Sequence, residues 1–264
     1  LVPFAFMLTI LMGTALLMLP VARAEIGHAP FMTAFFVATS SVAVTGLTVV
    51  DSASYWSGFG QAVMFCLFQI GGVGIMSSAT LLVVMVSRKL SLTRQIVVTA
   101  ESRGIQFGDV KVVLKLAVLV MLSVEFLVAA VMLPHFQARG LPLAASLWQA
   151  VFHSGAAFTN AGFSIFPGGA SDFASDPAML IAIMIAVLVG GLGLPVYHDL
   201  KCAATDGRKL SLHTKLTLVT TLSLYLLSMV LVLMFEWTNP ATLAGLGPVD
   251  RLANAAYHGF MARS

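Results

Sequence analysis

Charged side chains are scarce in this sequence of 264 residues: 9% are Asp, Glu, Lys or Arg, whereas 59% are hydrophobic. A soluble domain of ordinary composition carries about a quarter charged residues. A chain of this length has too few charges to cover the surface of one or two soluble domains. Together with a mean hydropathy of +0.97, the composition indicates a protein whose outer surface is solvated by lipid.

Cysteine is also rare, and the two that occur give no disulfide framework. Cys66 lies in an apolar run and Cys202 lies beside a basic stretch, so both are expected to be reduced. The apolar run at 1–20 lacks a basic segment and a convincing cleavage site, and it is expected to be a membrane helix. A nucleotide-binding fingerprint is excluded because the glycines at 71–74 follow no strand, and nothing supports binding to nucleic acid.

Long apolar segments predict how the chain crosses a membrane. A spanning helix needs about 20 mostly apolar residues. Segments of this kind lie at 3–20, 56–86, 110–133, 178–198 and 211–236. The predicted fold class is therefore an all-α polytopic membrane protein.

Two shorter apolar stretches, 30–50 and 142–166, are predicted to enter the membrane without crossing it. Each begins with a proline, which favours the first turn of a helix, and each ends in a loop of small residues with a central glycine. The basic segments 87–115 and 199–215 are expected to face the cytoplasm, where Lys and Arg concentrate. Re-entrant stretches are the simpler way to keep both basic segments on one side.

An internal repeat organises the chain. Three landmarks recur at nearly one spacing, which indicates a duplicated unit. They are Gly46 and Gly162 (116 positions), Gly71-Gly72-Val73-Gly74 and Gly190-Gly191-Leu192-Gly193 (119), and Arg88-Lys89-Leu90-Ser91-Leu92 and Arg208-Lys209-Leu210-Ser211-Leu212 (120). The predicted organisation is a first repeat at 1–87, a basic connection at 88–109, a second repeat at 110–200 and the start of a third at 201–264. Tandem helix–pore helix–loop–helix repeats predict a pseudo-fourfold pore, which further residues or further chains would complete.

The two glycine-centred loops predict a cation filter. A potassium ion that leaves water needs replacement oxygens, which backbone carbonyls supply, and glycine accepts the positive φ that such a loop requires. The residues predicted to line the filter are Val44, Thr45, Gly46 and Leu47 in the first loop and Asn160, Ala161, Gly162 and Phe163 in the second. The inner-helix glycines are interpreted as helix-packing positions, with a gating hinge as the alternative: Gly71, Gly72, Gly74, Gly190, Gly191 and Gly193.

Taken together, these motifs resemble the Trk/Ktr/HKT superfamily of potassium transporters, and in particular its Ktr-type membrane subunit. The residues similar to family motifs are 38–47 with Asp51 (first pore loop), 152–163 (second pore loop), 69–74 (inner-helix glycines) and 261–264 (start of the third loop). The resemblance implies four units in one polypeptide, a homodimer, and a cytosolic ring of nucleotide-binding regulatory subunits. It also implies potassium as the transported ion and, for some members, sodium as an activator.

The leading hypothesis is therefore a potassium-selective conducting subunit of the cell membrane that is not an enzyme. The alternative is an alternating-access secondary transporter whose re-entrant loops bind substrate, although parallel repeats favour the pore. An intramembrane hydrolase built on His153 and Ser154 lacks an acid and an oxyanion site. Glu125 is an acid well inside a predicted span, and a structural, hydrogen-bonded role is favoured for it. The basic loops are expected to contact a cytosolic partner or anionic lipid headgroups.

Overall fold

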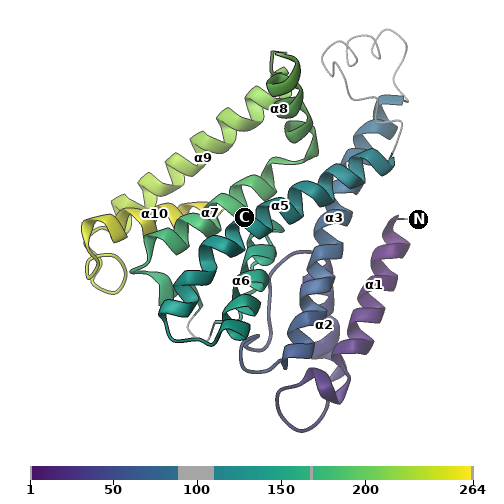
Figure 1. Ribbon diagram of the computed structural model, residues 1–264, viewed down its shortest axis with the longest axis vertical. Helices are drawn as coiled ribbons and strands as arrows, with labels where there is room; N and C mark the ends of the chain where they lie inside the picture. The colour runs from purple at the N-terminus through teal and green to yellow at the C-terminus, as the bar shows by residue number, and fades with distance from the viewer. Residues whose placement is uncertain (1, 89–109, 167–168, 208, 263–264) are drawn as a thin grey trace.

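The computed structural model describes residues 2–88, 110–166, 169–207 and 209–262, and this part of the chain consists mainly of α-helices (Figure 1). The basic connection predicted at 88–109 lies almost wholly outside the described residues. In chain order the elements are α1 (Val2–Leu17), η1 (Pro20–Ala22), α2 (Phe31–Val42), α3 (Gly58–Arg88), α5 (Val110–Ala138), α6 (Leu143–Phe158), η2 (Gly169–Phe173), α7 (Pro177–Leu192), α8 (Leu194–Asp206), α9 (Leu212–Glu236) and α10 (Pro248–Met261).

The short helices begin where the sequence predicts. Pro30 and Pro142 occupy the N-cap positions of α2 and α6, with the extended backbone that proline favours before a helix. At 12 residues, α2 is about 18 Å long and is too short to cross a hydrocarbon core of about 30 Å. The 16 residues of α6 also fall below the usual length of a span.

Among the described residues, three helices contain stretches long and apolar enough to cross a membrane, at Gly58–Ile75, Lys115–Ala138 and Leu212–Glu236. These stretches confirm three of the predicted spans. Their outward faces carry many exposed Leu, Val, Met and Phe side chains, and α9 is the least covered by the rest of the protein. Such surfaces are stable in lipid rather than in water.

The other two predicted spans differ from the structure. The segment 3–20 forms the helix α1, which ends at Leu17, three residues before the predicted end. The span predicted at 178–198 is sharply bent, because α7 ends at Leu192 and α8 leaves it at an angle of 95°. Gly193 makes this break with a φ of +81°, and Pro195 in the first turn of α8 cannot donate a backbone hydrogen bond to α7. A fourth span results only if α7 and α8 count as one.

Two glycines bring the inner helices α3 and α7 into contact with the ends of the short helices. A Cβ atom built on Gly71 would overlap the carbonyl oxygen of Val42, the last residue of α2. A Cβ atom on Gly190 would overlap the carbonyl oxygen of Phe158, the last residue of α6. The two contacts therefore recur at the spacings of the internal repeat, and in both the obstacle is main chain, which cannot rotate away.

The neighbouring glycines of α3 face other helices. A Cβ atom on Gly72 would lie 2.8 Å from Cγ2 of Thr159, just after the end of α6. A Cβ atom on Gly74 would lie 2.9 Å from the ring of Phe6 in α1. The first glycine motif thus allows α3 to approach three helices, including both short ones (Figure 1).

Two adjacent glycines on α7 test the importance of the close contact between α7 and the end of α6. Gly190→Ala should lower the free energy of unfolding by about 1–3 kcal/mol, the usual cost of overpacking, because its methyl group meets the Phe158 carbonyl. Gly191→Ala is the matched control, since its Cβ would meet only Nδ2 of Asn160 at 3.9 Å and alanine favours helix by about 1 kcal/mol. Thermal unfolding in detergent measures both. Equal midpoints for the two variants would contradict the packing role of Gly190.

Candidate functional site

The two loops that follow α2 and α6 have the same backbone hydrogen bonds, displaced by 116 positions. In each loop a pair of bonds runs from the residues after the helix back to its last turn, which is the Schellman arrangement of a helix end. The first loop has Thr45 N–H to Ser40 O (2.9 Å) and Val44 N–H to Ser41 O (3.2 Å), and the second has Ala161 N–H to Ala156 O (2.8 Å) and Asn160 N–H to Ala157 O (3.2 Å).

Each loop contains two residues with positive φ, of which the sequence predicts only the glycines. Gly46 and Gly162 have φ of 71° and 70°, whereas Val44 and Asn160 have φ of 55° and 58°. Asparagine tolerates this conformation, but a β-branched valine does so only with strain, on the order of 1–3 kcal/mol. An asparagine two residues before the glycine is a usable signal, whereas nothing in the sequence marks Val44.

The glycines of the two loops lie against each other. A Cβ atom on Gly46 would lie 3.0 Å from Cα of Gly162 and would overlap the carbonyl oxygen of Ala161. A Cβ atom on Gly162 would lie 3.3 Å from Cα of Gly46. Chain segments far apart in sequence are therefore brought together at the residues that the repeat makes equivalent.

The carbonyl oxygens of these loops have no internal partner within the described residues. No hydrogen-bond donor there reaches the carbonyls of 44–47 or 160–163. A polar backbone group left unpaired in hydrocarbon costs several kcal/mol, so irregular backbone at membrane depth is tolerated where it lines a cavity or is buried in protein. The predicted filter residues thus form two neighbouring sets of unpaired acceptors.

The side chains of the two loops differ in their surroundings. Leu47 is 62% exposed, whereas its counterpart Phe163 is 3% exposed and stacks on Phe68 of α3, with 6.2 Å between ring centroids. Thr45 donates a hydrogen bond from Oγ1 to Oγ of Ser40 at 2.9 Å, which further closes the first loop.

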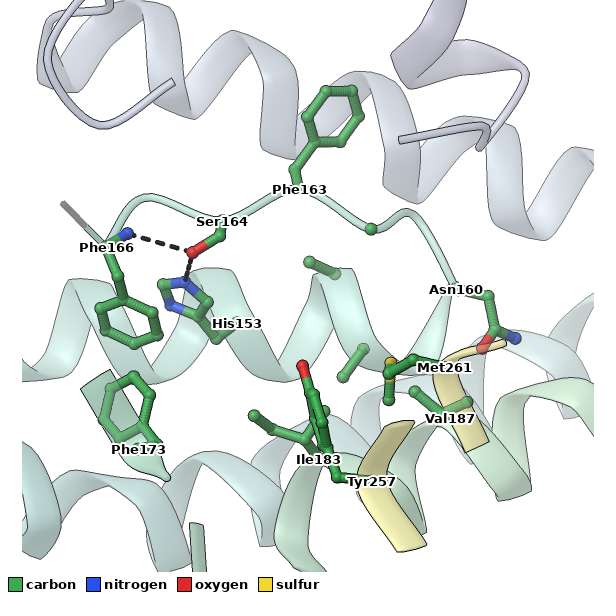
Figure 2. A pocket seen from close by; sticks show the side chains of 13 residues that line it. His153, Asn160, Phe163, Ser164, Phe166, Phe173, Ile183, Val187, Tyr257 and Met261 are labelled. Atoms are coloured by element: carbon green, nitrogen blue, oxygen red, sulfur yellow. Dashed lines mark hydrogen bonds between the residues drawn. The ribbon is translucent and has the colours of Figure 1, made fainter. Parts of the chain in front are cut away.

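His153 in α6 holds the outgoing part of the second loop (Figure 2). Its Nδ1 lies 2.8 Å from the carbonyl oxygen of Gln149, and its Nε2 lies 3.2 Å from the backbone nitrogen of Ile165. Because the first partner only accepts and the second only donates, Nδ1 carries the proton and the ring is neutral. The ring also stacks on Phe166, with 3.7 Å between centroids.

Two polar residues singled out in the sequence have hydrogen-bond partners. Glu125 of α5 accepts a hydrogen bond through Oε2 from Nε2 of Gln69 in α3, at 2.7 Å, so it joins the first unit to the second. The hydroxyl of Ser154 donates to the carbonyl oxygen of Val151 at 3.0 Å. The contact with Gln69 supports the structural, hydrogen-bonded role predicted for Glu125.

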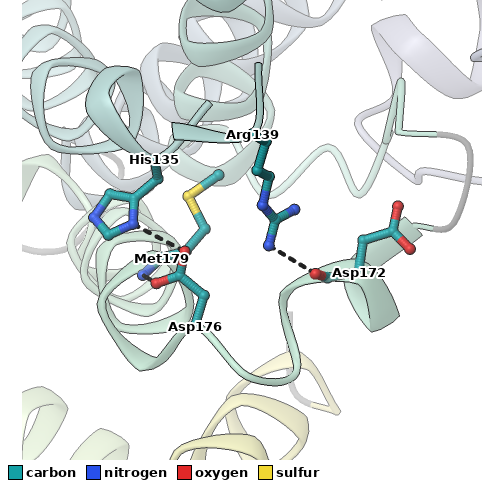
Figure 3. A network of polar contacts seen from close by, with 5 residues as sticks. All are labelled: His135, Arg139, Asp172, Asp176 and Met179. Atoms are coloured by element: carbon teal, nitrogen blue, oxygen red, sulfur yellow. Dashed lines mark hydrogen bonds and ion pairs between the residues drawn. The ribbon is translucent and has the colours of Figure 1, made fainter. Parts of the chain in front are cut away.

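A polar network joins the C-terminal end of α5 to the segment that precedes α7 (Figure 3). Arg139 donates from Nη2 to the carbonyl oxygen of Asp172 at 2.7 Å, and its guanidinium group lies 3.9 Å from the centroid of the Phe173 ring. His135 contacts Asp176 at 2.9 Å, and Asp176 also caps α7.

In the first unit, Asp51 follows the first loop. The hydrogen bond from Ser54 is the main cause that lowers the pKa of Asp51.

A cavity of about 310 Å³ lies beside the second loop, between α6, α7 and α10 (Figure 2). Most of its lining is apolar. Its residues are His153, Ala156, Ala157, Asn160, Gly162, Phe163, Ser164, Phe166, Phe173, Ile183, Val187, Tyr257 and Met261.

Short helices that end in glycine-centred loops, set among longer apolar helices, define an α-helical membrane protein. The TrkH family model, described as a cation transport protein, matches residues 7–250. The chain belongs to this family.

Curated relatives share this similarity over nearly the whole chain. The chain is 36% identical over 247 residues to the Ktr system potassium uptake protein B of Bacillus subtilis, covering 94% of this chain and 55% of the relative. It is 32% identical over 246 residues to the protein of the same name from Vibrio alginolyticus (92% and 53%). It is 30% identical over 263 residues to the potassium/sodium uptake protein NtpJ of Enterococcus hirae (97% and 56%). The chain therefore spans about half the length of these relatives.

The contribution of His153 to the second loop is measurable. His153→Phe retains an aromatic ring against Phe166 but leaves the buried N–H of Ile165 without its acceptor, which should cost about 1–3 kcal/mol of stability. The exposed His213 at the start of α9 offers a control, since His213→Phe changes no buried hydrogen bond. If thermal unfolding in detergent gave the same midpoint for both variants, the anchoring role of His153 would be wrong.

Proposed function

We propose that this chain forms part of the potassium-selective pathway of a Trk/Ktr-type uptake system, in which the ion passes through a filter of backbone carbonyls. The observation that carries this proposal is the meeting of two equivalent loops at Gly46 and Gly162, each with carbonyls that no described donor reaches. Such an arrangement supplies oxygens to a cation that has lost its water. The lining residues are Val44, Thr45, Gly46, Leu47, Asn160, Ala161, Gly162 and Phe163.

The physical mechanism needs no chemical energy at this subunit. The C-terminal ends of α2 and α6 lead directly into the loops, and their partial negative charge favours a cation there. Inward movement of one positive charge gains about 2.3 kcal/mol per 100 mV of membrane potential. The membrane potential therefore drives uptake once the filter compensates for dehydration.

The inner-helix glycines are proposed to fix the filter by packing. Gly71 and Gly190 let α3 and α7 lie against the last carbonyls of the short helices. The inner helices thus hold in place the helix end from which each loop begins. Gly72 and Gly74 serve neighbouring helices in the same way, and Gly191 adds little. Gly193, where the helix breaks with positive φ, is the position that best fits the alternative hinge role.

Partners and ions follow from the family. We propose a homodimer in the cell membrane, surrounded by lipid, with the basic segments 87–115 and 199–215 on the cytoplasmic side, where a ring of nucleotide-binding regulatory subunits docks. The relatives named as parts of a Ktr system support a partner subunit, and the name of the Enterococcus relative supports sodium as a further ion. An enzymatic activity is not part of the proposal.

The alternative, an alternating-access secondary transporter with re-entrant substrate-binding loops, is favoured by inverted repeats. The basic segments 87–115 and 199–215, expected on the same side of the membrane, instead favour parallel units. Unitary current steps from the full-length protein in planar bilayers would exclude the carrier.

Substitution of the filter glycines tests the proposal. Gly46→Ala is expected to reduce rubidium uptake roughly 5- to 150-fold, if the 1–3 kcal/mol of backbone strain enters the transport barrier. Gly162→Ala should have a smaller effect, because its Cβ meets only the Gly46 Cα whereas that of Gly46 also overlaps the Ala161 carbonyl. Uptake is measured with the full-length protein in a host that lacks potassium transport.

The control is Gly140→Ala. Gly140 has φ of +84°, with nothing within 4 Å of an added Cβ, so this variant introduces comparable backbone strain outside the two loops. Unaltered uptake and ion selectivity in Gly46→Ala, at equal membrane levels, would refute the filter assignment.

A further inference from the structure

The side chain that follows the second filter glycine is buried in the first unit. Phe163 is 3% exposed, and it stacks on Phe68 of α3. It belongs to one apolar cluster with residues of α2, α3 and α6, which include Val37, Met64, Phe68, Phe152 and Ala156. Phe163 thus acts as a plug, and this cluster is the socket that receives it.

The cavity of about 310 Å³ is lined by the residues that correspond to this socket one unit later. On the inner helices, where the glycine motifs are 119 positions apart, Ile183 and Val187 correspond to Met64 and Phe68. On the short helices, where the loops are 116 positions apart, His153 corresponds to Val37.

The third short helix completes the correspondence. Gly259 of α10 aligns with Ser154 of α6, 105 positions earlier, in the comparison of their sequences. At that spacing Tyr257 and Met261, which line the cavity, correspond to Phe152 and Ala156 of the filled socket. Five of the thirteen lining residues thus correspond to residues of the filled socket, while the cavity contains no counterpart of Phe163 among the described residues.

The first loop presents the opposite situation. Leu47 follows Gly46 as Phe163 follows Gly162, yet 62% of its surface is exposed. Within the described residues, the plug Phe163 therefore occupies its socket, the cavity is a corresponding socket without a plug, and Leu47 is a corresponding plug without a socket.

We propose that this plug and socket form the repeating joint of the pore ring, and that the cavity receives the apolar side chain after the glycine of the next filter loop in the same polypeptide. The inference rests on the proposed function, because it takes the repeats as units of one ring. Met261 ends α10 and lines the cavity, so the chain that leaves α10 starts at the cavity's edge. In the second unit the plug lies seven positions after Ala156, the counterpart of Met261.

The chemistry of the cavity fits an apolar occupant better than water. Its volume of about 310 Å³ equals roughly ten water molecules at about 30 Å³ each, but apolar cavities remain dry and buried water needs two to four polar partners. Ile183, Val187 and Phe173 offer none. The lining also includes His153, Asn160, Ser164 and Tyr257, of which His153 and Ser164 already have partners within the protein. A large aliphatic or aromatic side chain occupies part of such a space and gains dispersion contacts with its walls.

The first experiment uses the sign of a stability change in the full-length polypeptide. If the socket is filled, Val187→Trp competes with the plug and should lower the midpoint of thermal unfolding in detergent. If the cavity is empty, the same substitution fills it and leaves the midpoint equal or higher, which would overturn the proposal. Ile185→Trp is the matched control, because Ile185 lies two residues away on α7 and is 50% exposed.

The second experiment asks whether Leu47 is buried in the complete protein. In a background with Cys66→Ser and Cys202→Ser, single cysteines replace Leu47, Val49 and Ile165, which are 62%, 55% and 3% exposed here. The proposal expects Leu47→Cys to react with a maleimide about tenfold or more slowly than Val49→Cys, and as slowly as Ile165→Cys, because thiol reactivity follows exposure. Equal rates at positions 47 and 49 would overturn it.

The same variants separate the remaining explanations. Protection of Leu47→Cys that is lost when the protein is dispersed into single polypeptides would assign the joint to a second copy and overturn the assignment within one chain. Protection that persists supports it. Rubidium uptake by the three variants reports on the filter independently, since a protein that fails to transport still gives the labelling pattern of an assembled ring.

Discussion

Gly71 and Gly190 lie so close to the ends of α2 and α6 that a methyl group at either position would overlap a main-chain carbonyl oxygen. This contact between an inner helix and the end of a short helix determines where each loop starts. The loops then have a common geometry because both leave their helix through the same hydrogen bonds. A main-chain obstacle cannot adopt another rotamer, so the loop position follows from backbone packing rather than from side-chain choice.

The sequence was sufficient for the main features that depend on periodicity and on marked residues. Apolar length predicted α3, α5 and α9, because lipid imposes a minimum length on a spanning helix. Pro30 and Pro142 predicted the starts of the short helices, because proline is compatible with the first turn and lacks an N–H that later turns need. The positive φ of Gly46 and Gly162 also followed, since glycine alone adopts it without a steric penalty.

Other features could not be predicted because they depend on tertiary contacts. Val44 adopts a left-handed conformation against its own preference, and only the surrounding loop can impose this. Pro195 indicates a kink in this helix, but the angle of 95° and the break at Gly193 emerge only from the structure. His153 is indistinguishable in sequence from a catalytic or exposed histidine, and its role becomes visible when Ile165 is placed against Nε2.

Leu47 is exposed whereas Phe163 is buried, and this difference bears on how the proposed pore ring closes. A joint in which one unit supplies a plug and its neighbour supplies a socket is heterologous, and heterologous contacts give either a closed ring or an open series. The rotation between units decides between these outcomes, and in the proposed pore ring the contact of Gly46 with Gly162 lies near the axis and sets this rotation. The contact between the glycines lies near the axis of the proposed ring, and the inserted plug lies farther from it. Both contacts therefore constrain the rotation between neighbouring units. A change in the size of a plug should therefore act on the filter through the angle between units, although the plug's side chain itself offers no oxygen to the ion.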